Sequence, residues 1–271
     1  VDWLLNITSG RRAHQTTIDF FDAFPESFGA HIFAEDVPEK AALNLVETYK
    51  DTSKTIIGPA GVGLLVPGFL KLGVVGGVDW RQLQKNSLQM PGSVAVVSAS
   101  GGMINEIITI VSTTSHNFSF APCIGGDRFP YTDPVEAFLA AENDEQTSHI
   151  VYYGELGGED EYRIVESMHE GKITKPVIAY IAGVIGETFD QPVQFGHAKA
   201  LAGSKDETAS AKRSAMKQAG VHVAASMTEF TQMITDIPKN ESNRQTNNDF
   251  SNRTQSHFTS TISKESVRGY E

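Results

Sequence analysis

The 271-residue sequence contains a single cysteine, Cys123, and therefore cannot form an internal disulfide bond. This usage is typical of a reducing compartment and predicts a cytoplasmic location. The sequence has no apolar run of about 18 residues, which excludes a transmembrane helix. Its first residues, Val1-Asp2-Trp3-Leu4-Leu5, lack the charged region of a signal peptide.

Positive charge is also scarce. Lys and Arg number 22 against 33 Asp and Glu, the net charge is −11, and no Lys/Arg cluster occurs. Nucleic-acid-binding proteins usually carry a basic stripe, so this class of partner is excluded. No Cys/His cluster has the spacing of a zinc site, and no Gly-x-x-x-x-Gly-Lys-Ser/Thr loop occurs. We therefore expect neither a metal site nor a nucleotide site of that kind in the chain.

The sequence does have a regular alternation of short apolar runs with helix-like segments. Its 24 glycines fit many tight turns, and its 40% of hydrophobic residues are enough for a core. The alternation is typical of parallel βαβ units and predicts an α/β fold. The expected strands are 3–7, 30–34, 55–57, 93–97, 118–124, 149–153, 176–182 and 221–223. The expected helices are 13–24, 38–50, 102–113, 134–143, 159–170, 207–219 and 227–234.

This pattern divides the chain into three predicted parts. Residues 1–88 hold three strands, fewer than a complete doubly wound domain, and 67–91 reads as a connection. Residues 89–237 hold five strands and are predicted to form a flavodoxin-like domain with a doubly wound parallel sheet. Residues 238–271 are rich in Asn, Ser, Thr and charge, and are predicted to be a flexible polar tail.

Four Gly-rich loops follow the strands of the second predicted domain. They are Ser98-Ala99-Ser100-Gly101-Gly102, Ile124-Gly125-Gly126-Asp127, Gly154-Glu155-Leu156-Gly157-Gly158 and Phe195-Gly196-His197-Ala198. In an open parallel sheet such loops converge outside the carboxyl ends of the strands. We therefore expect a histidine, a glutamate, an aspartate and a helix N-terminus to share one crevice.

His197 is the candidate for carrying a phosphoryl group. Its neighbours Gly196 and Ala198 are small and leave room on the ring. A neutral imidazole is a nucleophile near pH 7. Glu155 is the candidate carboxylate for the other ring nitrogen, where it would fix the tautomer; the alternative is a solvated loop acid.

The 98–102 loop is the candidate phosphate-binding site. Ser98 and Ser100 supply hydroxyls, while Gly101 and Gly102 supply backbone N–H groups at a helix N-terminus. An ordinary turn with a serine N-cap fits the same sequence. Further candidates for the pocket are Gly125, Gly126, Asp127, Gly196 and Lys199. Asp127 fits equally well as a cap near the next helix.

A set of ordered motifs gives the sequence a resemblance to a known family. They are Ile57-Gly58-Pro59-Ala60, Pro67-Gly68, Pro91-Gly92-Ser93-Val94-Ala95, the four loops above, Asn105-Glu106, Arg128-Phe129-Pro130, Val193-Gln194, Glu207-Thr208-Ala209, Ala211-Lys212 and Ala219-Gly220-Val221. Together they resemble the alpha-subunit-like module of the ADP-forming acyl-CoA synthetases, the family of succinyl-CoA synthetase. The ATP-citrate lyase and citryl-CoA synthetase branch is the more similar one.

The resemblance implies the roles of the site residues. His197 would be the phosphohistidine, Glu155 its orienting carboxylate, and the 98–102 loop the site of the phosphoryl group. The reaction would form an acyl-CoA from citrate, coenzyme A and ATP. A partner ATP-grasp module or subunit would hold ATP and Mg²⁺. The resemblance also implies an oligomer, and in a lyase a citrate-synthase-like domain, whose beginning residues 258–263 weakly resemble.

The resemblance gives the first domain an identity as well. Residues 1–88 resemble the C-terminal part of a Rossmann-like CoA-binding domain, whose first strand and phosphate loop would precede Val1. The chain alone is therefore expected to bind coenzyme A poorly.

Three positions depart from the family pattern. Lys199 replaces the second glycine of Gly-His-Ala-Gly, Ala99 stands where Arg is usual, and Asp36 replaces a glycine. Lys199 is expected either to contact the phosphate or to restrict the loop. Two alternatives to the citrate-activating module stay open. One is the alpha subunit of a succinyl-CoA synthetase-type ligase, and the other is a non-catalytic assembly module of the same fold.

Overall fold

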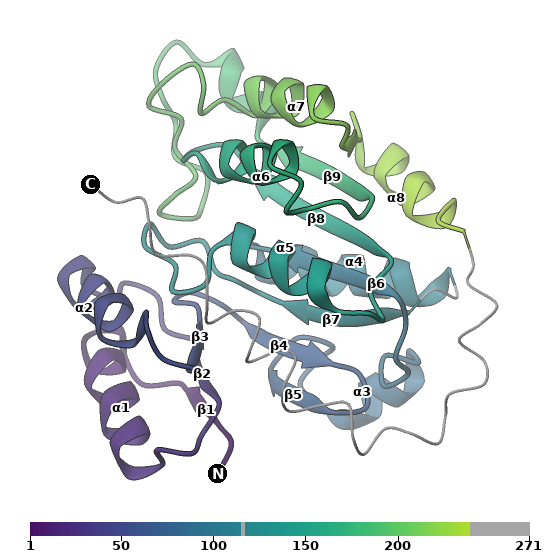
Figure 1. Cartoon of the computed structure of the whole chain (residues 1–271). Helices are drawn as coiled ribbons and strands as arrows, with labels where there is room; N and C mark the ends of the chain where they lie inside the picture. The colour runs from purple at the N-terminus through teal and green to yellow at the C-terminus, as the bar shows by residue number, and fades with distance from the viewer. Residues whose placement is uncertain (115–116, 239–271) are drawn as a thin grey trace.

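The protein is described by a computed structural model that covers residues 1–114 and 117–238. The strands form two sheets. One has three strands in the order β1-β2-β3, and the other has seven in the order β10-β9-β8-β6-β7-β4-β5. Figure 1 shows the smaller sheet with its two helices beside the larger helix-covered sheet. The predicted α/β fold class is confirmed.

The smaller sheet is parallel throughout. Its elements are β1 (Trp3–Asn6), α1 (Gly10–Ala23), β2 (Gly29–Ile32), α2 (Glu39–Tyr49) and β3 (Thr55–Ile57). Helix α1 buries Ala13, Thr17 and Phe21, which recur every fourth residue and therefore lie on one face. Asn6, at the end of β1, donates hydrogen bonds to Ala13 O and Thr17 Oγ1, which satisfies its buried amide.

The larger sheet contains a flavodoxin-like core. Its parallel strands are β6 (Val94–Ser98), β7 (Phe118–Pro122), β8 (His149–Glu155), β9 (Val177–Ala182) and β10 (His222–Val223). The spatial order β7-β6-β8-β9-β10 is the 2-1-3-4-5 order of a doubly wound flavodoxin-like sheet. This order matches the sequence prediction for the second domain.

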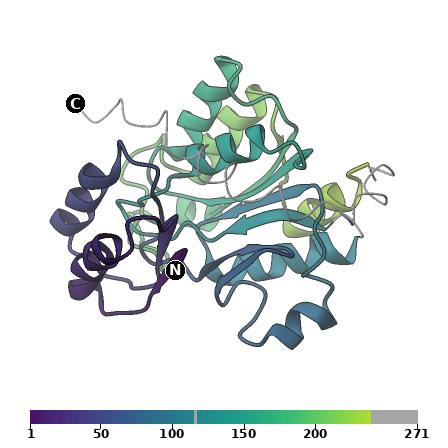
Figure 2. The ribbon, with the colours of Figure 1, turned by 60° about the horizontal axis from the view of Figure 1, so that its bottom comes forward.

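Helices cover both faces of this sheet, as Figure 2 shows. They are α4 (Gly101–Thr113), α5 (Pro134–Asn143), α6 (Asp160–His169), α7 (Ala209–Gln218) and α8 (Met227–Thr235). Helices α4 and α8 pack together, and α6 packs against both α5 and α7. Along β6, Ala95 and Val97 enter one buried cluster while Val94 and Val96 enter the other. A strand buried on both faces explains the continuous apolar run in the sequence.

The segment 67–91 differs from the expected connection. It contains β5 (Leu70–Gly73) and α3 (Trp80–Lys85), and β5 forms an antiparallel hairpin with β4 (Gly63–Val66). Strand β4 also pairs with β7, so the hairpin extends the larger sheet. The proposed division at residues 88–89 therefore stays a prediction, and the predicted tail lies outside the described residues except for Pro238.

The described helices include none that is both long and apolar enough to cross a membrane.

His31 is a buried titratable group where the smaller sheet meets the larger one. Its side chain on β2 is 0% exposed, and a Cβ added at Gly61 would lie 3.0 Å from its Nε2 and 2.5 Å from the carbonyl oxygen of Cys123. Neither ring nitrogen makes a hydrogen bond of regular geometry among the described residues, although backbone groups of Cys123 and Gly63 lie near enough to act on the ring. Burial lowers the pKa of His31 from 6.5 to about 4.

This burial predicts a pH-dependent stability. In the unfolded chain His31 becomes protonated below pH 6.5, whereas in the folded protein it stays neutral until about pH 4. The free energy of unfolding therefore has its full value above pH 6.5. As the pH is lowered from 6.5 toward 4, it decreases by about 1.4 kcal/mol per pH unit. Between pH 7 and pH 5, the free energy of unfolding of His31→Gln should fall by about 2 kcal/mol less than that of the parent. Urea titrations measure this difference, and an equal fall in both proteins would contradict it.

Candidate active site

The site lies where three neighbouring strands of the larger sheet end. Ser98 of β6 is in register with Tyr153 of β8, two residues before Glu155, and it also pairs with Cys123 after β7. The loops that follow these strands therefore start at the same edge. The sheet topology alone brings the 98–102, 124–127 and 154–158 loops together.

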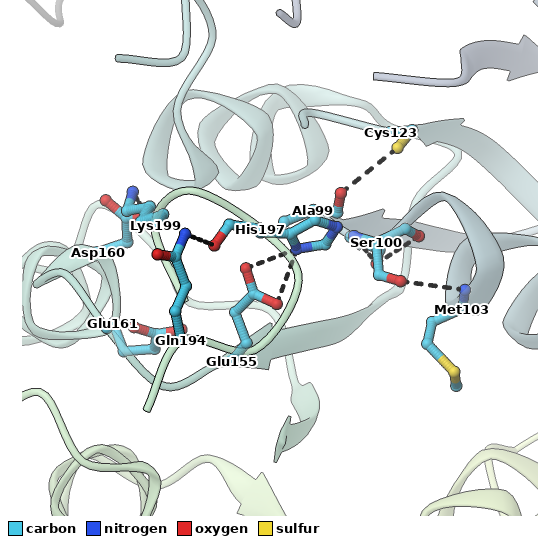
Figure 3. A network of polar contacts seen from close by, with 12 residues as sticks. Ala99, Ser100, Met103, Cys123, Glu155, Asp160, Glu161, Gln194, His197 and Lys199 are labelled. Atoms are coloured by element: carbon cyan, nitrogen blue, oxygen red, sulfur yellow. Dashed lines mark hydrogen bonds and ion pairs between the residues drawn. The ribbon is translucent and has the colours of Figure 1, made fainter. Parts of the chain in front are cut away.

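His197 and Glu155 are in direct contact at this edge. Nδ1 of His197 lies 2.8 Å from Oε1 and 2.9 Å from Oε2 of Glu155, although the residues are 42 positions apart. The side chains are 30% and 18% exposed, so the pair is partly buried but still reached by solvent. Figure 3 shows the carboxylate of Glu155 pointing toward the ring. A proton on Nδ1 donates to the carboxylate and leaves Nε2 as the ring's acceptor.

The surroundings of His197 favour its protonated form. The hydrogen bond to Glu155 raises the pKa of His197 above 6.5, partial burial opposes this, and the charges of Glu155 and Glu35 raise it further. Glu35 comes from the segment between β2 and α2, so the smaller sheet contributes charge to the site. Sequence reasoning did not select Glu35, since no local pattern indicates how the two sheets sit together.

The backbone around His197 is held closely. A Cβ at Gly126 would lie 2.3 Å from Cγ of His197, so only glycine fits against the ring. The carbonyl oxygen of Gly126 accepts a hydrogen bond from the backbone N–H of Lys199 at 3.2 Å. Gln194 Nε2 donates to the carbonyl oxygen of His197 at 3.1 Å. Gly196 has φ +73°, a conformation that favours glycine.

The 98–102 turn begins α4, as predicted. The hydroxyl of Ser98 is buried and accepts from Ser100 N at 3.0 Å, while Ser100 Oγ accepts from Met103 N at 3.4 Å and caps the helix. Both serines thus support the turn. The N–H groups of Gly101 and Gly102 lie in the first turn, where no intrahelical acceptor exists. A Cβ at Gly102 would meet nothing within 4 Å.

Three further residues predicted for the pocket make contacts of their own. Asp127 accepts a hydrogen bond from Arg128 N at 2.7 Å, and burial raises its pKa, with the charges of Asp36 and Glu39 adding to the effect. Lys199 Nζ is bound to the carboxylate of Asp160. Gly125 packs against the carbonyl oxygen of Pro59 and has φ +90°.

A buried ion pair beneath Glu155 was not predicted. Lys212 of α7 lies 2.6 Å from Oε2 of Glu161, and the side chains are only 1% and 2% exposed. Lys212 Nζ also donates to the carbonyl oxygens of Glu155 at 3.0 Å and Gly157 at 2.5 Å. Glu161 in turn accepts from the hydroxyl of Tyr152 at 2.9 Å. Lys212 belongs to one of the motifs of the family resemblance, but the sequence alone does not indicate that a lysine in a helix is buried.

Comparisons with known proteins agree with this architecture. Residues 97–222 match the model of the CoA-ligase family. Probable ATP-citrate synthase subunit 1 of Schizosaccharomyces pombe is 38% identical over 237 residues, which are 88% of this chain and 38% of that protein. ATP-citrate synthase of Homo sapiens is 38% identical over 237 residues, which are 88% of this chain and 21% of that protein.

Solved structures give the same result. ATP citrate lyase from Methanothrix soehngenii, in complex with citrate and coenzyme A, matches with a TM-score of 0.82 and 36% identity, covering 87% of this chain and 38% of that one. The dinucleotide forming acetyl-coenzyme A synthetase 1 of Ca. Korarchaeum cryptofilum is 20% identical over 88% of this chain and 49% of that one, with a TM-score of 0.63, and supports the fold alone.

The fold, the sheet-edge site and the match to residues 97–222 define a CoA-ligase domain. Over 88% of its length the chain is similar to ATP-citrate synthases, and over 87% it is similar to a solved ATP citrate lyase. It spans only between 21% and 38% of the length of the curated relatives described above.

The contact between His197 and Glu155 predicts a shift that can be measured. Replacing Glu155 by Gln removes the carboxylate that favours the imidazolium, so the pKa of His197 should fall. NMR titration of the His197 ring measures it, with the exposed Glu159→Gln as control. A pKa unchanged in Glu155→Gln would mean that the two groups are not paired in solution.

The buried pair predicts a large loss of stability on removing one partner. Lys212→Met leaves Glu161 charged and unpaired in the interior, which should cost about 3–5 kcal/mol of unfolding free energy. Adding Glu161→Gln should recover part of the loss, whereas the exposed Lys217→Met on the same helix should have little effect. Urea unfolding measures all four proteins. A loss in Lys212→Met no larger than in Lys217→Met would contradict the pairing.

Proposed function

We propose that this chain is the phosphohistidine-carrying module of an ATP-dependent enzyme that activates citrate as its CoA thioester. The observation that carries the proposal is the contact between Nδ1 of His197 and the carboxylate of Glu155. A nucleophilic imidazole needs one nitrogen free and the other held in a fixed protonation state. This pair meets both needs at the ligand-binding edge of a doubly wound sheet.

The first step transfers phosphorus to the protein. Nε2 of neutral His197 attacks the γ-phosphorus of ATP; the Nε2–P bond forms, the P–O bond to ADP breaks, and ADP leaves. The ring gains positive character while Nδ1–H still donates to Glu155, and the negative charge of the carboxylate stabilises it. Glu155 is therefore assigned the task of fixing the tautomer and balancing the charge.

The next two steps pass the phosphoryl group on. A carboxylate oxygen of citrate attacks the phosphorus, the P–Nε2 bond breaks, and its electron pair returns to the imidazole. The sulfur of coenzyme A, having lost its proton, then attacks the acyl carbon of the citryl phosphate. The C–O bond breaks, inorganic phosphate leaves, and a thioester remains.

The first turn of α4 suits the anion in these steps. The helix dipole and the N–H groups of Gly101 and Gly102 favour negative charge without any Lys or Arg. Open space at Gly102 supports this assignment. The hydroxyls of Ser98 and Ser100 are assigned to holding the turn in shape.

The remaining components are assigned to partners. Among residues 1–114 and 117–238, no group of three or more His, Cys, Asp or Glu side chains is arranged to hold a metal ion. Mg²⁺ is therefore assigned, with ATP, to an ATP-grasp module or subunit, where it would balance the phosphate charge. We further propose that a citrate-synthase-like domain completes the enzyme, that it works as an oligomer, and that it acts in the cytoplasm.

Citrate is preferred to succinate because of the relatives. The chain is 36–39% identical to ATP-citrate synthases over 237 residues. A solved relative is described as a complex with citrate and coenzyme A.

Phosphorylation tests the proposal directly. The chain is incubated with its ATP-grasp partner and γ-labelled ATP, and an acid-labile, base-stable label should form. His197→Ala should remove the label, because the nitrogen assigned to accept the phosphoryl group is then missing. Glu155→Gln should slow labelling by roughly 10²- to 10⁴-fold, the range for groups that hold a histidine in its reactive form.

Two outcomes would redirect the proposal. Absence of label, or a label that persists in His197→Ala, would favour a non-catalytic assembly module. Thioester formation from succinate but not from citrate would favour a succinyl-CoA synthetase-type ligase.

A further inference from the structure

Lys199, which lies only two residues from His197, is held at two points, its ammonium group and its backbone N–H. Its ammonium group forms an ion pair with Asp160, the first residue of α6, and the side chains are 17% and 19% exposed. Its backbone N–H donates to the carbonyl oxygen of Gly126. Figure 3 shows Lys199 and Asp160 on one side of His197, with Ser100 on the other.

The loop after β8 is shaped to receive this lysine. A Cβ at Gly157 would lie 2.0 Å from the carbonyl oxygen of Lys199, and a Cβ at Gly158 would lie 2.6 Å from its Cε. The two glycines therefore leave a channel for the main chain and the stem of Lys199. The ammonium group emerges at Asp160 and is engaged there, away from the 98–102 turn.

The first turn of α6 thereby holds both halves of the candidate site. Asp160 binds Lys199 of the His197 loop, and its neighbour Glu161 binds Lys212. Lys212 donates to the carbonyl oxygen of Glu155 itself. Two adjacent carboxylates on one rigid helix thus fix the distance between the loop that carries His197 and the strand end that carries Glu155.

We propose that Lys199 is a positioning residue, which through its ion pair with Asp160 holds the His197 ring against Glu155. The loop is otherwise tied by single hydrogen bonds, such as those from Gln194 and to Gly126. An ion pair shielded from water holds a loop more firmly than an exposed one. This inference deepens the proposed function, since it concerns the same histidine, but it can be tested without nucleotide.

The test is an NMR titration of the His197 ring in the full chain, without ATP, coenzyme A or partner. Loss of a nearby positive charge would by itself raise the pKa of a histidine. Loss of a positioning contact acts in the opposite direction, because the ring spends less time on Glu155. We expect the pKa of His197 to be lower in Lys199→Gln than in the parent. The resonance is assigned by its absence in His197→Asn.

Further variants separate positioning from charge and from folding. Lys205→Gln removes an exposed lysine of the same segment and should not lower the pKa of His197. Lys199→Arg keeps the ion pair and should retain the parent value. Asp160→Asn should lower it too, but loss of a negative charge acts in the same direction, so this variant is used only in the double-mutant cycle. The double variant Lys199→Gln/Asp160→Asn should lower it no further than the stronger single variant, because both changes break one contact.

The sign of the shift decides the outcome. A pKa of His197 that is unchanged or higher in Lys199→Gln overturns the proposal, as does a fully additive effect in the double variant. Failure of ATP labelling with a lowered pKa in Lys199→Gln would reject the proposed function and keep this inference. Normal labelling with an unchanged pKa of His197 in Lys199→Gln would keep the proposed function and reject this inference.

Discussion

The hydrogen bond between His197 and Glu155 is the interaction on which the rest of the site depends. It assigns different tasks to two nitrogens of one ring, because Nδ1 is occupied by a carboxylate and Nε2 is left to react. The fold makes this contact possible by ending β8 at Glu155, next to β6 and within reach of the loop after β9. An imidazole without this partner would exchange tautomers freely and lose much of its value as a carrier.

The contact between His197 and Glu155 is supported by a buried ion pair and by a glycine beside the ring. Lys212 and Glu161 are nearly inaccessible to water, and burial raises the pKa of Glu161 while the charge of Lys212 counteracts it. Such a pair adds little net stability, but breaking it leaves an uncompensated charge in the interior. Gly126 acts through shape, since any side chain there would occupy the position of the His197 ring.

Much of this architecture could be predicted from the sequence, because parallel strands place their following loops at one edge regardless of detail. Apolar runs and Gly-rich turns located β6 to β9, and the same logic brought Glu155 and His197 together. The β4–β5 hairpin was missed because its strands are four residues each and are joined through Pro67-Gly68, which reads as a turn. Contacts between Lys199 and Asp160, and the burial of His31, depend on how distant segments pack, which no local pattern records.

The most direct measurement of the central claim is to identify the ring nitrogen that carries phosphorus. The chain is phosphorylated by ATP and its ATP-grasp partner with ¹⁵N-labelled histidine, and ¹H–¹⁵N and ³¹P NMR locate the phosphoryl group. The account predicts phosphorus on Nε2 of His197, with Nδ1 still protonated against Glu155. Phosphorus on Nδ1 would contradict it, because that nitrogen cannot bind both the carboxylate and the phosphoryl group.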